Sequence, residues 1–150
     1  MSVDPRGQRF AAAVTTAVLA AVLLTQSVWL LALQAVVFAI GALAGVRRSP
    51  YALVFATVLR PRLGPPAHTE ASQPPRFAQA VGLVFALAGL AGFVLGLPAL
   101  GLAATGLALA AAFLNAAFGF CLGCEMYLLI RRTFPNRNSN RASTPTEVSA

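Results

Sequence analysis

The sequence contains no lysine and only four acidic residues among 150, so all eleven basic residues are arginines and the formal net charge is +7. It also has no charged residue between positions 10 and 46 or between positions 77 and 124. Because 58% of the residues are hydrophobic and the mean hydropathy is +0.76, these uncharged stretches suit a lipid bilayer and exclude an ordinary water-soluble enzyme. The arginines flank the stretches, which excludes a nucleic-acid-binding face.

Cysteine is equally scarce, since the only two, Cys121 and Cys124, form a single C-x-x-C motif. One pair cannot provide the disulfide framework of a small secreted domain. The sequence also lacks a phosphate-binding glycine loop, the residue order of a serine hydrolase, a haem motif and a metalloprotease helix, so it indicates no particular cofactor. The cysteine pair is therefore the motif whose chemistry has to be explained.

Four apolar segments predict an all-α integral membrane protein made of two helical hairpins. The residues 25–27 and Pro98 mark the hairpin turns. We interpret the first segment as a span and not as a cleaved signal peptide, because a second span follows it directly. The predicted spans cover about residues 10–25, 28–46, 77–97 and 101–130.

The segment between the hairpins predicts a short interfacial helix. Ser49 followed by Pro50 is typical of a helix start, and the apolar run that follows ends near residue 60. A helix over about 50–60 is too short to span a membrane, so we expect it to lie at the cytoplasmic face. Residues 1–9 form a cytoplasmic segment, and the polar residues 133–150 predict a disordered cytoplasmic tail.

The arginines also predict the orientation, because they precede the first span, lie between the second and third, and follow the fourth. By the positive-inside rule both termini and the middle segment face the cytoplasm. A short repeat supports two equivalent hairpins. Arg9-Phe10-Ala-Ala-Ala-Val recurs as Arg76-Phe77-Ala-Gln-Ala-Val, although alanine-rich sequences also repeat by chance.

The candidate site lies in the fourth span, where Cys121, Cys124 and Glu125 are spaced to share one helical face near the cytoplasmic end. A pair late in a long helix and beside a carboxylate favours neutral thiols. A helix break at Gly119 or Gly123 would instead give Cys124 a new helix N-terminus. The two thiols can also hold a soft metal ion, or simply pack as small apolar side chains.

Other polar residues within the spans suggest structural roles. Gln34, Gln79 and Asn115 predict hydrogen bonds between helices, and the glycines predict close helix packing. His68 lies in a proline-rich stretch and is expected to be solvated.

The motif from Asn115 to Tyr127, together with Arg48-Ser49-Pro50-Tyr51 and the segment 75–82, is similar to a family of small bacterial integral membrane proteins catalogued as domain-of-unknown-function family 4395. The resemblance covers about residues 3–132. It implies a multi-pass protein of the bacterial inner membrane. Genes of this family accompany thioredoxin-like or rhodanese-like sulfurtransferase genes, which implies thiol or sulfur handling by association.

Three functions follow from these observations. The first is a thiol-disulfide or persulfide relay, in which Cys121 and Cys124 exchange with a cytoplasmic thioredoxin-like or rhodanese-like protein and Glu125 handles the proton. The second is binding of copper or zinc by Cys121 and Cys124. The third is a membrane scaffold that docks a soluble enzyme. A homodimer through the glycine-rich helix faces is compatible with each.

Overall fold

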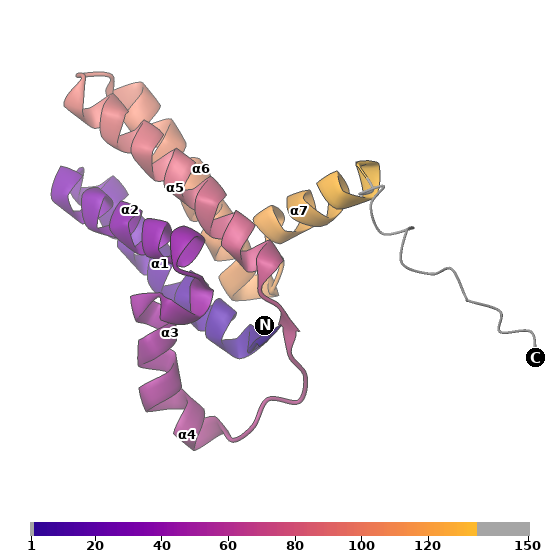
Figure 1. Cartoon of the computed structure of the whole chain (residues 1–150). Helices are drawn as coiled ribbons and strands as arrows, with labels where there is room; N and C mark the ends of the chain where they lie inside the picture. Colours follow the sequence, from indigo (N-terminus) through magenta and orange to yellow (C-terminus); the bar gives the residue numbers. More distant parts are fainter. Residues whose placement is uncertain (1, 135–150) are drawn as a thin grey trace, which may run out of the picture.

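The computed structural model describes residues 2–134, and these fold almost entirely into helices (Figure 1). The helical class is therefore confirmed. The two-residue strands β1 (Ser2–Val3) and β2 (Glu70–Ala71) pair antiparallel, with Val3 opposite Glu70. The helical segments are α1 (Pro5–Thr25), α2 (Val28–Leu43), η1 (Val46–Arg48), α3 (Pro50–Val54), η2 (Phe55–Leu59), α4 (Arg60–Leu63), α5 (Gln73–Val94), α6 (Pro98–Phe118) and α7 (Leu122–Thr133).

Three helices, α1, α5 and α6, are long and apolar enough to cross a membrane, whereas α2 is apolar but has 16 residues. Helix α1 is longer than the predicted segment 10–25, because the Asp4 carboxylate accepts a hydrogen bond from the Arg6 backbone N–H and Pro5 occupies the first turn. Helix α2 ends before the predicted residue 46. Gly45 follows it with a φ of +99°, a conformation that glycine adopts without strain.

The prediction of one continuous helix over residues 101–130 is wrong. Helix α6 ends at Phe118, Gly119 adopts a left-handed conformation with a φ of +68°, and α7 begins only at Leu122. The guanidinium group of Arg9 donates hydrogen bonds to the carbonyls of Ala116 (3.2 Å) and Ala117 (3.3 Å), and so satisfies the exposed end of α6. Figure 1 shows α7 leaving the bundle at an angle to α6.

The long helices pack mainly as the pairs α1 with α6, α2 with α5, and α5 with α6. Gly92 in α5 allows a close approach to α6, because a Cβ at this position would collide with the backbone of Gly101. The prediction that Gln34 bonds between helices is confirmed, since its Oε1 accepts a hydrogen bond from the Tyr51 hydroxyl at 2.8 Å. The buried core consists of Leu19, Val22, Leu31, Ala35, Phe38, Ala86 and Ala108.

The predicted helix at about 50–60 is confirmed and extends to Leu63, as α3, the π-helical segment η2, and α4. Phe55 anchors it, because this side chain is buried and its ring lies 5.9 Å from that of Phe10 in α1. Arg6 holds the far end by donating to the carbonyls of Leu63 and Gly64. The predicted tail 133–150 lies outside the described residues from position 135 onward.

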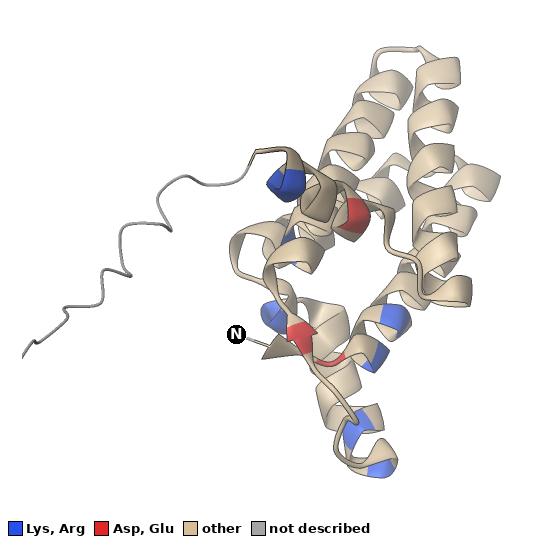
Figure 2. Cartoon of the chain, turned by 90° about the vertical axis from the view of Figure 1, so that its right-hand side faces the viewer, with Lys and Arg blue, Asp and Glu red and all other residues tan. Residues whose placement is uncertain are grey.

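Charged residues in the described part of the chain gather at one end of the bundle. Figure 2 shows arginine and acidic positions around α3, α4, α7 and the start of α1, whereas the two hairpin turns carry none. The helix ends that meet α7 therefore form the polar end of the molecule.

Candidate functional site

The break after α6 determines where the cysteines lie. Cys121 is the N-cap residue of α7, and its sulfur accepts a hydrogen bond from the backbone N–H of Cys124 at 3.3 Å. Cys124 and Glu125 occupy the first turn of the same helix. Both cysteines are half-buried free thiols. The expectation that the pair lies late in a long helix is thus wrong, and the sulfur of Cys121 faces the positive end of a helix dipole.

This geometry shifts the pKa values of the two thiols in opposite directions. The hydrogen bond from the Cys124 thiol, with smaller contributions from the backbone N–H groups of Cys124 and Gly123, lowers the pKa of Cys121 to about 7. Burial and the Glu125 carboxylate act in the opposite direction. The pKa of Cys124 is raised, chiefly because its thiol donates that hydrogen bond and because it is partly buried. Cys121 is therefore the thiolate of the pair near neutral pH, and thiolates are the reactive form of cysteine.

Both cysteines line a cavity of about 350 Å³ at the polar end of the bundle. Its walls carry the charged residues Arg9, Glu70 and Glu125. Glu70 is brought there by the pairing of β2 with β1, and Arg9 by its hydrogen bonds to the end of α6. The cavity therefore offers the thiols a polar approach from the end of the bundle that carries the arginines.

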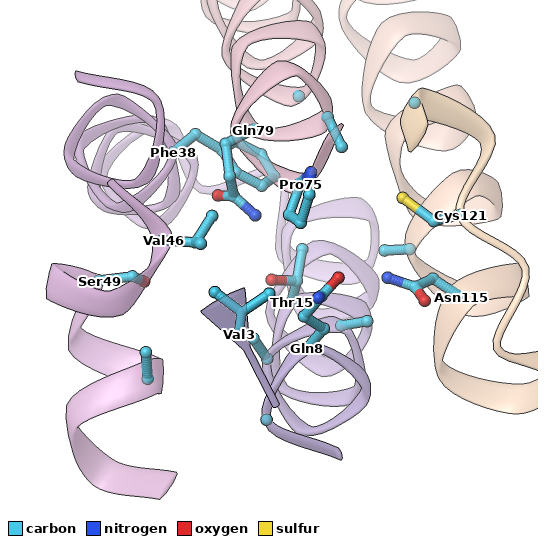
Figure 3. Close-up of a pocket in the computed structure, with 18 of the residues that line it drawn as sticks. Val3, Gln8, Thr15, Phe38, Val46, Ser49, Pro75, Gln79, Asn115 and Cys121 are labelled. Atoms are coloured by element: carbon cyan, nitrogen blue, oxygen red, sulfur yellow. The ribbon is translucent and has the colours of Figure 1, made fainter. Parts of the chain in front are cut away.

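Cys121 also lines a second, larger cavity of about 680 Å³, which Cys124 does not reach. This cavity lies between α1, α2, α3, α5, α6 and the start of α7, and most of its lining is apolar. Figure 3 shows the Cys121 sulfur facing this space, with Gln8, Thr15 and Asn115 nearby and Ser49 on the opposite side. Cys121 thus belongs to the wall that the two cavities share, together with Gln8, Pro75 and Asn115.

The predicted site residues Cys121, Cys124 and Glu125 meet at the smaller cavity, where Glu125 is exposed. His68 is exposed and lies outside both cavities. Among residues 2–134, no group of three or more His, Cys, Asp and Glu side chains has the geometry to hold a metal ion. The pair would thus bring only its own two thiols to a metal.

Sequence reasoning missed several neighbours of the thiols. Arg9 was interpreted only as a flank of the first span, although the repeated Arg-Phe pair signalled a special position. Gln8 and Asn115 line both cavities, and the Nε2 atom of Gln8 is buried without a hydrogen-bond partner. Nothing in the sequence signalled Gln8, because its neighbours come from distant parts of the chain.

Comparisons with curated proteins and with solved structures gave no match. The comparison with protein families gave a match that covers nearly the whole described region and includes the cysteine motif. The profile of one family matches residues 3–132, from β1 to the last turn of α7. On that match the chain belongs to the family described as Domain of unknown function (DUF4395).

Proposed function

We propose that the protein crosses the bacterial inner membrane four times, with both termini and the α3 to α4 segment in the cytoplasm. The gathering of arginines at one end of the bundle supports this orientation. Helix α2 is about 24 Å long, somewhat less than the ~30 Å of a bilayer core. Local thinning of the bilayer around α2 makes up the difference at modest cost.

Within that frame, we propose that Cys121 and Cys124 form a thiol relay that a cytoplasmic partner reaches through the smaller cavity. The observation that carries the proposal is the position of Cys121 at the N-cap of α7, where the Cys124 N–H and thiol both stabilise its thiolate. The raised pKa of Cys124 keeps it protonated until Cys121 has reacted. These are the separate properties that an attacking and a resolving thiol need.

The relay has two balanced steps. The Cys121 thiolate attacks one sulfur of a partner disulfide, a new S–S bond forms, and the partner's other sulfur leaves as a thiolate. Cys124 then loses its proton to the Glu125 carboxylate or to water and attacks the Cys121 sulfur, which releases the partner as a dithiol and leaves a Cys121–Cys124 disulfide. With a persulfide the first attack moves the outer sulfur to Cys121, and the partner leaves as a thiolate.

We further propose that the partner is a cytoplasmic thioredoxin-like or rhodanese-like protein. Arg9, Glu70 and Glu125 give the smaller cavity charges of both signs, which suits a polar protein loop carrying a reactive cysteine.

The test is intact-mass spectrometry of the purified, reduced protein after reaction with 2-hydroxyethyl disulfide at pH 7. The wild type should end as an internal disulfide without a retained adduct. Cys124→Ser should retain one mixed disulfide on Cys121, because the resolving thiol is missing. Cys121→Ser should react at least about tenfold more slowly than the wild type, since Cys124 remains protonated.

Other results would contradict the relay. Equal adduct formation on both single variants would show that the two thiols are not differentiated. A stoichiometric copper or zinc ion that copurifies and protects both thiols would favour metal binding. If the double variant Cys121→Ser/Cys124→Ser retained full function in a cellular assay, the protein would act as a scaffold and the pair as packing.

A further inference from the structure

The larger cavity, of about 680 Å³, is not explained by exchange with a soluble partner. Its volume falls within the ~300–1,000 Å³ typical of small-molecule sites. Many small apolar residues of α1, α5 and α6 line it, and the sulfur of Cys121 lies at one side (Figure 3). The cavity is therefore suited to an apolar molecule that must approach this one sulfur.

The cavity also reaches into the part of the bundle expected to lie in lipid. It extends along α6 from Asn115, near the polar end, to Leu107 in the middle of the helix. The distance from Leu107 to the end of α6 is about 16 Å of helix. A ligand of this cavity would thus come from the bilayer and meet the thiol at the membrane surface.

Polar side chains line the cavity at several points, Ser49 and Gln79 among them, and two of them lie at the end near Cys121. Gln8 and Asn115 line both cavities, and the Nε2 atom of Gln8 is buried with no partner in the described structure. An unpaired buried N–H costs about 1–3 kcal/mol, so a ligand oxygen that accepts from it would be favoured. The site therefore selects an apolar molecule with a carbonyl oxygen beside the reactive sulfur.

We propose that this cavity binds a lipid-soluble quinone, which accepts the electrons that the Cys121–Cys124 pair receives. The proposal rests on the proposed thiol relay. A quinone combines a flat ring, two carbonyl oxygens and an apolar tail. It is also a two-electron acceptor, which is what a dithiol needs in order to become a disulfide.

The reaction balances as follows. The Cys121 thiolate adds to a ring carbon of the quinone and forms a C–S bond. Cys124 loses its proton and attacks the Cys121 sulfur, so that an S–S bond forms, the C–S bond breaks and its electron pair stays on the ring. In total the two thiols lose two electrons and two protons, and the quinone gains both as a quinol. A cytoplasmic dithiol then reduces the new disulfide through the smaller cavity, by the reverse of the two exchange steps proposed above.

The experiment mixes the reduced protein anaerobically with decylubiquinone, whose fully substituted ring disfavours lasting thiol adducts. Quinol formation is followed by absorbance, and the reaction with 2-hydroxyethyl disulfide is measured in parallel. The wild type should form one quinol per chain and lose both thiols. The ratio of quinone rate to disulfide rate should fall at least tenfold in Ala112→Leu, which fills the cavity. Ala110→Leu is the matched control, because Ala110 lies on the opposite face of α6, is exposed and does not line the cavity. This variant should keep the wild-type ratio.

A second variant tests the polar end of the cavity without changing its volume much. Gln8→Leu should raise about tenfold the decylubiquinone concentration that gives half the maximal rate, because the donor to the quinone oxygen is lost.

The outcomes separate the two proposals. Disulfide exchange without any quinol would overturn the quinone site and leave the thiol relay standing. Quinol formation that Ala112→Leu and Gln8→Leu do not slow would also overturn it, because the reaction would then occur outside the cavity. A stable quinone adduct on Cys121 with Cys124 still reduced would do the same. Loss of both reactions in the wild type would refute the relay itself.

Discussion

The two halves of the molecule, residues 5–63 and 73–133, repeat the same contacts, and their differences locate the chemistry. Arg9 at the start of α1 binds the last carbonyls of α6, and Arg76 at the start of α5 binds those of α2, at Ala42 (2.9 Å) and Leu43 (3.2 Å). Each half thus donates hydrogen bonds to the last carbonyls of the second long helix in the other half. This reciprocal arrangement is what a two-fold axis between equivalent hairpins would produce, and the repeated Arg-Phe pair lies at its centre.

The second helix of each hairpin also ends in the same way. A glycine with positive φ follows each, Gly45 or Gly119, and a further helix starts shortly afterwards. That helix packs back on its own hairpin through an aromatic pair, Phe10 with Phe55 in the first half and Phe77 with Tyr127 in the second, at 5.9 and 5.8 Å.

The halves differ in the residue that starts the last helix. Ser49 is the N-cap of α3 without a side-chain hydrogen bond, whereas Cys121 caps α7 through its sulfur. Both line the larger cavity, from opposite sides (Figure 3). The scaffold therefore supplies two equivalent helix starts, and only the second carries a thiol, Cys121, at the N-cap.

The largest expected effect concerns the aromatic anchors. Phe55→Ala should lower the free energy of unfolding by about 3 kcal/mol, because the ring is buried. Tyr127→Ala should lower it by only about 1 kcal/mol, because that ring is half-exposed. Unfolding by SDS in mixed micelles measures both. A larger loss for Tyr127→Ala would mean that α7, and not α3, is the more firmly anchored helix.

The reciprocal caps should contribute less. Arg9→Gln and Arg76→Gln should each lower the same free energy of unfolding by about 1 kcal/mol, because the carbonyls at the end of the opposite hairpin lose a charged donor. Only Arg9→Gln should also slow the reaction of Cys121 with an anionic aromatic disulfide, since only Arg9 lines the thiol cavity. If Arg76→Gln slowed it equally, the loss would reflect general loosening of the bundle.

The smallest effect should be electrostatic and confined to the second half. The rate of Cys121 alkylation by iodoacetamide should rise with pH and reach half its maximum at about 7. Glu125→Gln should move this profile to lower pH, because removing a negative charge stabilises the thiolate. Glu70→Gln is the matched control, since the Glu70 charge acts on Cys124. A shift of the profile to higher pH in Glu125→Gln would contradict the assigned role of that charge.

Several features could be predicted from residues alone because their causes are local. Ser49-Pro50 signals a helix start in any context, and the uncharged turn at residues 25–27 separates two apolar runs. The end of α6 could be named only as an alternative, a break at Gly119 or Gly123, and not chosen over a continuing helix. Gly119 and its neighbours are compatible with a continuing helix, and the break is favoured by the guanidinium of Arg9, more than a hundred residues earlier in the chain.

The sequence by itself determined the helical class, the family, the helix at about 50–60 and the C-x-x-C pair, because hydrophobic length, capping residues and motif spacing act over short distances along the chain. Only the tertiary structure decided that Cys121 caps a helix and that Gln8, Arg9 and Asn115 surround it. Those relations join α1 to α6 across the bundle. They arise from packing and from unsatisfied helix-end carbonyls, which no local pattern encodes.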